Sequence, residues 1–211
     1  MKLVKQIAAT LVLAAAIAPA SANIVTNGGF ELDDGSWQTE TWSTFGRGVH
    51  SGGSSMGTGC TPGAGFTCTL SQTLATVAGQ RYDLTFWLYA DGYLNGAGEV
   101  INQFDNGLRV WFGDEVAYTV LNFPTTNTGN SASPGGPSTL ITVSNLLATS
   151  ASTILQFAGY HGPLGIYVDD VAVVALESEE PGEVPEPGTL SLLGLALGGL
   201  ALARRRRARA G

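Results

Sequence analysis

Two acidic side chains lie beside segments whose other residues predict burial, and they raise the question of a metal. Asp169 stands two residues before Val171, and the strand period of two predicts that both point to the core. An ionised carboxylate on the core side is costly unless a cation or several donors meet it. Calcium prefers oxygen ligands, and Glu31 could supply a second carboxylate from the end of the first predicted strand. The alternative is that Asp169 caps a loop and Glu31 lies on the surface.

Aromatic and arginine side chains occur on the polar side of two predicted strands, where they could contact a ligand. Residues 80–90 and 107–113 alternate apolar with polar positions, and the polar positions include the following four side chains. They are Trp87, Tyr89, Arg109 and Trp111. Aromatic rings can stack on sugar rings, and a guanidinium donates hydrogen bonds to hydroxyl groups. The alternative is that these rings pack in the core or against cross-strand neighbours.

The two cysteines, Cys60 and Cys68, flank a short loop that contains a Pro-Gly pair. A structural zinc ion needs four ligands, and only His50 and His161 could complete such a set. In an exported protein the spacing therefore favours a local disulfide. Such a disulfide would pin the loop and stabilise the fold by about 2 kcal/mol.

Patterns that could indicate an enzyme are weak. Residues 53–57 match the Gly-x-Ser-x-Gly pattern, but a nucleophile elbow needs a strand-to-helix turn, and nothing around it predicts an α/β-hydrolase. A glycoside hydrolase needs two carboxylates at a defined separation, which a sequence with many acidic residues does not reveal. We therefore expect a protein that is not an enzyme.

Short β-type segments separated by Gly, Asn and Ser clusters must position these side chains. The clearest segment places Tyr82, Leu84, Phe86 and Leu88 on one face, as a half-buried strand requires. Between residues 23 and 176 no convincing amphipathic helix occurs, so we predict an all-β fold, an antiparallel β-sandwich of the jelly-roll type. The predicted strands are 24–26, 37–45, 66–74, 80–90, 107–113, 116–121, 140–143, 153–158 and 164–176.

The two ends of the chain predict targeting signals rather than further fold. Residues 1–22 combine lysines, a short apolar run and an Ala-x-Ala site, which predicts a signal peptide cleaved after residue 22. Residues 177–187 are acidic and proline-rich, and we expect an extended spacer. Residues 188–211 contain an uncharged run, 189–203, that predicts a short transmembrane helix ahead of a cytoplasmic arginine cluster.

A proline–glutamate–proline triplet, an apolar segment and four arginines form a tripartite pattern near the C-terminus. The residues are Pro185, Glu186, Pro187, Arg204, Arg205, Arg206 and Arg207. This pattern resembles the PEP-CTERM sorting signal of Gram-negative bacteria, also described as an ice-binding protein C-terminal domain. The resemblance implies processing by an exosortase-type membrane enzyme and a transient stay in the inner membrane with the body outside. The implied destination is the cell surface or the extracellular matrix.

A looser pattern extends over nearly the whole body. Residues 27–31 (Asn-Gly-Gly-Phe-Glu) open it, residues 79–82 precede the clearest strand, and residues 167–171 (Tyr-Val-Asp-Asp-Val) close it. This order is similar to carbohydrate-binding modules of the family 4 and 9 type and to galactose-binding-like jelly rolls. The resemblance implies a structural calcium ion held by Glu31 and Asp169, and sugar binding through aromatic side chains.

The distribution of charge narrows the class of partner. The formal net charge is −7, but most basic residues lie at the two ends, and residues 23–176 hold three arginines and no lysine. A nucleic-acid partner is excluded, because phosphate backbones select clustered Lys and Arg. We expect an exported protein that binds polysaccharide. The alternatives are a structural or adhesion protein of the extracellular matrix and, less favoured, a glycoside hydrolase.

Overall fold

The computed structural model describes residues 22–61, 63, 65–94, 97, 100–101, 105–125, 138–162 and 164–177. These residues belong to the first of two units, 1–177, into which the chain divides. The predicted signal peptide up to residue 21, the spacer beyond Glu177, the predicted transmembrane helix and the arginine cluster all lie outside the described residues. In the described part, no helix has the length and apolar character needed to span a membrane.

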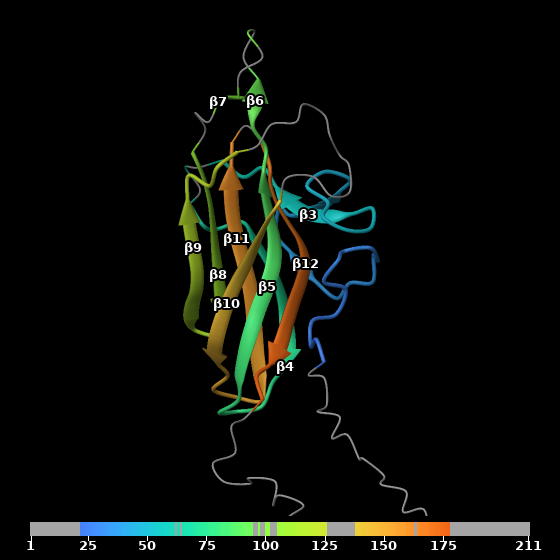
Figure 1. The fold of residues 1–211 in the computed structure, drawn as a ribbon, viewed down its shortest axis with the longest axis vertical. Helices are drawn as coiled ribbons and strands as arrows, with labels where there is room; N and C mark the ends of the chain where they lie inside the picture. Colours follow the sequence, from blue (N-terminus) through green and yellow to red (C-terminus); the bar gives the residue numbers. More distant parts are fainter. Residues whose placement is uncertain are drawn as a thin grey trace, which may run out of the picture. The chain divides into compact units, whose positions relative to one another are not determined.

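Two five-stranded antiparallel sheets form a sandwich, which confirms the predicted all-β architecture (Figure 1). Sheet A contains, in spatial order, β10 (Thr139–Leu147), β5 (Arg81–Ala90), β12 (Ile166–Ala175), β3 (Ser55–Thr58) and β2 (Ser43–Phe45). Sheet B contains β1 (Gln38–Thr39), β4 (Thr69–Ala75), β11 (Ser152–His161), β8 (Asn106–Phe112) and β9 (Glu115–Leu121). A separate ribbon pairs β6 (Tyr93–Leu94) with β7 (Val100–Ile101).

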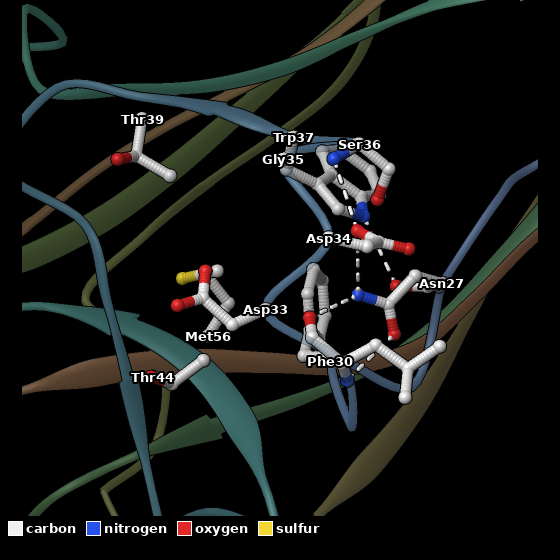
Figure 2. A pocket seen from close by; sticks show the side chains of 11 residues that line it. Asn27, Phe30, Asp33, Asp34, Gly35, Ser36, Trp37, Thr39, Thr44 and Met56 are labelled. Atoms are coloured by element: carbon white, nitrogen blue, oxygen red, sulfur yellow. Dashed lines mark hydrogen bonds between the residues drawn. The ribbon is translucent and has the colours of Figure 1, made fainter.

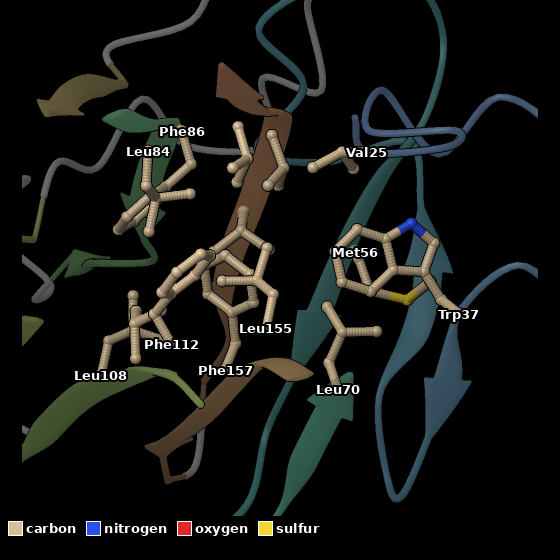
Figure 3. Close-up of a cluster of buried hydrophobic side chains, with 14 of the residues drawn as sticks. Val25, Trp37, Met56, Leu70, Leu84, Phe86, Leu108, Phe112, Leu155 and Phe157 are labelled. Atoms are coloured by element: carbon tan, nitrogen blue, oxygen red, sulfur yellow. The ribbon is translucent and has the colours of Figure 1, made fainter. Parts of the chain in front are cut away.

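The core lies between the inward faces of the two sheets (Figure 3). Alternation predicted its largest contributions correctly, because every second side chain of β5 and β8 is buried there. Phe86 of β5 meets Phe157 of β11 edge to face with ring centroids 5.2 Å apart, which joins the two sheets. The residues of β5 and β8 that alternate along the core face are Tyr82, Leu84, Phe86, Leu88, Leu108, Val110 and Phe112.

The predicted strands differ from the observed ones mainly near the N-terminus. Residues 24–26 form no strand, and the chain there is joined to β12 by an isolated bridge between Asn23 and Val174. The predicted strand 37–45 divides into β1 and β2, which belong to different sheets. Thr41 lies between them with a φ of 65°, a left-handed conformation that no continuous strand accommodates. The short strands β3, β6 and β7 were not predicted.

A β-bulge in β12 corrects the predicted direction of Asp169. The register with β5 shifts between Asp169 and Ala172, and Asp170 has a φ of 47°. Val168 and Val171 both belong to the core cluster although they are three residues apart. The prediction that Asp169 points to the core with Val171 is therefore wrong, because the bulge inverts the alternation. Asp169 lies opposite Trp87 on the outer side of sheet A and is buried there beneath a loop.

Candidate functional site

The four predicted ligand-binding residues separate into two pairs on opposite sides of the molecule. Trp87 and Tyr89 belong to β5 of sheet A, whereas Arg109 and Trp111 belong to β8 of sheet B. All four side chains alternate with core residues, so each pair lies on the outer face of its own sheet. The structure therefore brings together the members of each pair but not the two pairs.

On sheet A, the ring of Trp87 is covered by His50. The two rings are stacked with centroids 3.7 Å apart and planes only 9° apart. His50 Nδ1 lies 2.7 Å from Asp170 Oδ2, and this contact fixes the imidazole over the indole. One face of the Trp87 ring is thus occupied by the protein itself.

Tyr89, the second predicted residue on sheet A, is buried. Its ring packs 5.8 Å from that of Tyr167, whose hydroxyl donates a 2.9 Å hydrogen bond to Asp91 Oδ2. Arg47 Nη1 donates to the same oxygen at 3.0 Å. Burial raises the pKa of Tyr167, so its phenol stays protonated as a donor. This cluster joins β5, β12 and the loop before β3 in a packed network.

The two predicted metal ligands reach one loop, residues 50–54. Glu31 Oε1 accepts hydrogen bonds of 2.9 Å from the backbone N–H groups of Gly53 and Ser54. Asp169 Oδ2 accepts from the N–H groups of His50 (2.7 Å) and Ser51 (3.2 Å). At Gly52, which has a φ of 67°, a Cβ atom would lie 2.3 Å from Glu31 Oε1. The positive φ and the closeness of Glu31 both favour glycine at position 52, where the 50–54 loop closes around the two carboxylates.

A buried carboxylate needs either a cation or several hydrogen-bond donors, and the structure shows several donors around Asp169. Its second oxygen also accepts a 2.7 Å hydrogen bond from the N–H of Asp170, and its side chain has no exposed surface. Burial nevertheless raises the pKa of Asp169 to about 6, so these donors offset the loss of hydration only in part. No group of three or more His, Cys, Asp or Glu side chains gathers as a metal site among the residues that the structure describes. The hydrogen bonds around the two carboxylates come from N–H donors rather than oxygen ligands, and calcium binding stays a prediction.

The outer face of sheet B presents an arginine among aromatic rings. The Arg109 Cζ lies over the Phe66 ring, 4.3 Å from its centroid, and 5.7 Å from the centroid of Trp111. Arg109 Nε donates a 3.3 Å hydrogen bond to Thr119 Oγ1 on the neighbouring strand β9. The side chains of Phe66, Arg109 and Trp111 are all half-buried. We call Phe66, Arg109 and Trp111 the sheet B cluster.

Two neighbours extend the sheet B cluster on either side. Tyr160 of β11 packs 5.3 Å from Phe66 and donates a 3.2 Å hydrogen bond to Asp105 Oδ1. It can lie across β8 because its partner there is Gly107, where a Cβ atom would approach the ring to 2.8 Å. Gln156 is the cross-strand partner of Trp111 and is half-buried, so its amide lies on the same face. Aromatic rings, an amide and a guanidinium therefore lie beside one another on the outer face of sheet B.

The predicted disulfide between Cys60 and Cys68 is confirmed, and it closes the loop that carries Phe66. Both ends of this loop are also hydrogen-bonded to β11, with Gly159 N–H donating to Cys68 O and His161 N–H donating to Cys60 O. Sequence reasoning missed Phe66 and Tyr160 as candidate ligand contacts. The position of Phe66 between the two cysteines was the available signal, because a disulfide holds such a loop against its neighbours.

A pocket of about 130 Å³ lies elsewhere, between the loop after residue 26 and the short strands β1, β2 and β3 (Figure 2). Asn27 and Asp34 line one side of it, with Asn27 Nδ2 donating to Asp34 Oδ1 at 3.4 Å and Asp34 Oδ1 accepting from the N–H of Ser36. The hydrogen bonds with Ser36 lower the pKa of Asp34. These contacts close a turn, and the pocket contains none of the predicted ligand-binding residues.

Two side chains that the sequence analysis considered for chemistry, the serine of the Gly-x-Ser-x-Gly match and the possible zinc ligand His161, have structural contacts. Ser55, the central residue of the Gly-x-Ser-x-Gly match, is fully buried in β3 and its hydroxyl donates to Arg47 O. His161 is also fully buried, and its Nε2 lies 2.8 Å from Asp91 O. Burial lowers the pKa of His161, so the imidazole is neutral at physiological pH.

Comparison with known proteins identifies the C-terminal segment. Residues 183–207 match the PEP-CTERM protein-sorting motif, which contains the predicted Pro-Glu-Pro triplet and the four arginines. Proteins with this motif are exported and sorted to the surface, and the motif implies processing by an exosortase. No curated protein matches the chain.

The body is similar in structure to carbohydrate-binding modules. TmCBM61, solved in complex with β-1,4-galactotriose, is 15% identical with a TM-score of 0.50, and the match covers 74% of this chain and 100% of that one. The CBM22-1 xylan-binding domain from Paenibacillus barcinonensis is 11% identical with a TM-score of 0.45, covering 75% and 97%. A cyclase from Fischerella sp. TAU is 15% identical with a TM-score of 0.47, covering 74% and 98%. At such identities, the first likeness establishes the sandwich fold and no ligand.

Proposed function

We propose that the body is a polysaccharide-binding module whose ligand lies on the outer face of sheet B. The observation that carries the proposal is the sheet B cluster, in which half-buried rings and a guanidinium share one sheet face. Sugar rings offer apolar faces for stacking and hydroxyl groups for hydrogen bonds, and this face supplies both kinds of contact. The likeness to carbohydrate-binding modules agrees with this assignment but concerns the fold alone.

The residues on sheet A serve the fold in this proposal. Trp87 already stacks with His50, and Tyr89 is buried against Tyr167. Of the four predicted ligand-binding residues, Arg109 and Trp111 therefore keep that role, while Trp87 and Tyr89 hold the 46–54 segment in place. The PEP-CTERM motif would deliver such a module to the cell surface or extracellular matrix, where polysaccharide is present.

The binding proposal is tested by affinity electrophoresis of the full chain in gels containing galactan, xylan or an acidic polysaccharide. The wild type should be retarded by at least one polymer, the Trp111→Ala variant should not, and the Trp87→Ala variant should behave as wild type. Retardation by no polymer would overturn the proposal, as would retained binding in Trp111→Ala.

A second function, adhesion through protein contacts, is favoured by the edge strands β9 and β10. Val116 and Leu121 on β9 are 50% and 55% exposed, and Leu140 on β10 is 48% exposed. Apolar side chains on exposed strand edges can support association with another sheet. Sedimentation of the full chain distinguishes the two functions, because adhesion through these edges would give concentration-dependent association that Leu121→Lys abolishes.

We also propose that the exosortase processes the chain near Pro185, Glu186 and Pro187, after a transient stay in the inner membrane with the body outside. The residue types support this, since an arginine cluster directly after an apolar run marks the cytoplasmic side. Mass spectrometry of the mature protein from the producing cell should find a C-terminus near these residues. A mature chain that still contains Arg204–Arg207 would contradict the proposal.

A further inference from the structure

The strands of sheet B are almost free of charge. Among the residues of β1, β4, β8, β9 and β11, only Arg109 and Glu115 are charged, and Glu115 lies at the hairpin end of β9. The strands of sheet A, in contrast, include Asp83, Asp169 and Asp170. On a body rich in carboxylates, the outer face of sheet B is therefore a local exception with one central cation.

Arg109 differs from Arg47 and Arg81, the two other arginines of the described body, in the groups that its guanidinium contacts. Arg47 forms an ion pair of 3.0 Å with Asp91, and Arg81 donates a 2.9 Å hydrogen bond to the carbonyl of Asn145. Across the part of the chain that the structure describes, no carboxylate lies within ion-pair distance of Arg109. Its charge is instead placed over the Phe66 ring, and Nε is bonded to a neutral hydroxyl.

This arrangement prepares the guanidinium for a planar anion. A ring against the face of a guanidinium restricts its motion and leaves the N–H groups at its edge as donors. Those donors form two parallel hydrogen bonds with a carboxylate, a contact that a neutral hydroxyl cannot reproduce.

We infer that the sheet B cluster selects polysaccharides that carry carboxylate groups, with Arg109 as the residue that recognises the uronate. This inference rests on the proposed function and names the chemical class of its ligand. The pyranose ring of the uronate packs against Trp111, and its carboxylate accepts hydrogen bonds from the Arg109 guanidinium.

The remaining carboxylates of the body limit where an acidic chain can lie. Asp105, at the Tyr160 end of the face, is exposed and would repel an anionic sugar placed there. Screening at physiological ionic strength confines such repulsion to about 8 Å. Asp114 and Glu115, in the hairpin beyond Trp111, are exposed as well. The uronate therefore lies at Arg109, between the two acidic ends of the face, and neutral sugars or solvent lie toward either end.

The test uses two acidic polymers, polygalacturonate and alginate, each beside its esterified and uncharged form, with galactan and xylan as neutral polymers. Binding of the full chain is measured at low and at high salt. Arg109→Gln is compared with Arg81→Gln, which removes the same charge from the molecule but on sheet A. The structures of both variants are checked by circular dichroism.

The wild type should bind at least one acidic polymer roughly tenfold more tightly than its ester, since two charge-assisted hydrogen bonds distinguish them. Arg109→Gln should lose this preference and its salt dependence, and Arg81→Gln should keep both. Equal binding of acid and ester, binding of neutral polymers only, or equal losses in the two variants would overturn the inference and leave the proposed function standing. Binding of none of the polymers would overturn both.

Discussion

The outer faces of both sheets carry a tryptophan on a long strand, but the surroundings of the two indoles differ. On sheet A, Trp87 is stacked by His50, Tyr89 is buried, and the nearby charges are paired with one another. On sheet B, Trp111 and Arg109 are half-buried, and the Phe66 ring of the disulfide loop lies over the guanidinium, 4.3 Å from Arg109 Cζ. This difference comes from the loop that covers each sheet face rather than from the strands themselves.

The comparison shows how a loop decides the role of an exposed aromatic residue. Residues 46–54 cross sheet A because Asp169, Asp170 and Glu31 supply acceptors for their donors. Sheet B faces the disulfide loop, which places one ring, Phe66, over Arg109 and puts no stacked ring on the neighbouring indole among the described residues. Sheet A thus uses its aromatic residues for stability, and we propose that sheet B uses them for binding.

The largest expected difference is between the Trp111→Ala and Trp87→Ala variants. Loss of a stacking ring at the centre of a binding site costs about 2 kcal/mol, so Trp111→Ala should weaken polysaccharide binding roughly thirtyfold. Trp87→Ala should leave binding unchanged and lower the free energy of unfolding, because it removes the partner of His50. Isothermal titration and urea unfolding measure the two effects, and the reverse assignment of losses would exchange the roles of the faces.

Removal of the disulfide should affect stability and binding together. The double variant Cys60→Ser, Cys68→Ser opens a short ring, with an expected loss of about 2 kcal/mol in the free energy of unfolding. It should also weaken polysaccharide binding, because Phe66 is no longer held over Arg109. The control is Phe66→Ala, which keeps the disulfide and should lose affinity with a smaller loss of stability. Unchanged affinity in both variants would remove Phe66 from the site.

The pH dependence of stability should report on the buried side of sheet A. Asp169 has a pKa of about 6 in the folded state against 3.8 as the ordinary value, so the folded state binds the proton more tightly. Its contribution to stability is fully present below pH 3.8 and is lost as the pH rises through about 6. Each unit of this pKa difference corresponds to about 1.4 kcal/mol.

Urea unfolding between pH 4 and 7.5 in a chelator measures that loss, and Asp169→Asn should remove it. Calcium, if it binds Asp169 as the sequence predicts, favours the charged carboxylate and should flatten the same slope while raising the melting temperature. An Asp169→Asn variant with the wild-type slope would show that another group is responsible. Identical curves with calcium and with chelator would contradict the predicted calcium site.

The smallest expected effect is that of His50→Phe. Phenylalanine keeps a ring over Trp87 but loses the contact with Asp170, which should cost about 1 kcal/mol or less of unfolding free energy. Polysaccharide affinity should not change. His50→Ala, which uncovers the indole, sharpens the comparison: a gain in affinity would show that sheet A lacks binding only because it is covered.

The sequence correctly predicted features that depend on residues close together in the chain, such as which face of a strand is buried. The core faces of β5 and β8 follow from the period of two, and the disulfide follows from the short separation of Cys60 and Cys68. It did not predict that Trp87 and Trp111 lie on opposite faces, because strand pairing depends on the topology of the whole chain. The direction of Asp169 was wrong because a bulge leaves no mark in a pattern of Asp and Val.

Binding at sheet B is tested most directly by a heteronuclear NMR titration of the full chain with an oligosaccharide of a polymer that the protein binds. The titration follows the four indole N–H signals, which are assigned with Trp→Phe variants. The Trp111 signal should shift progressively with ligand and the Trp87 signal should not, while the buried Trp37 and Trp42 serve as internal references. A shift of Trp87 with Trp111 unchanged would contradict the assignment of binding to sheet B.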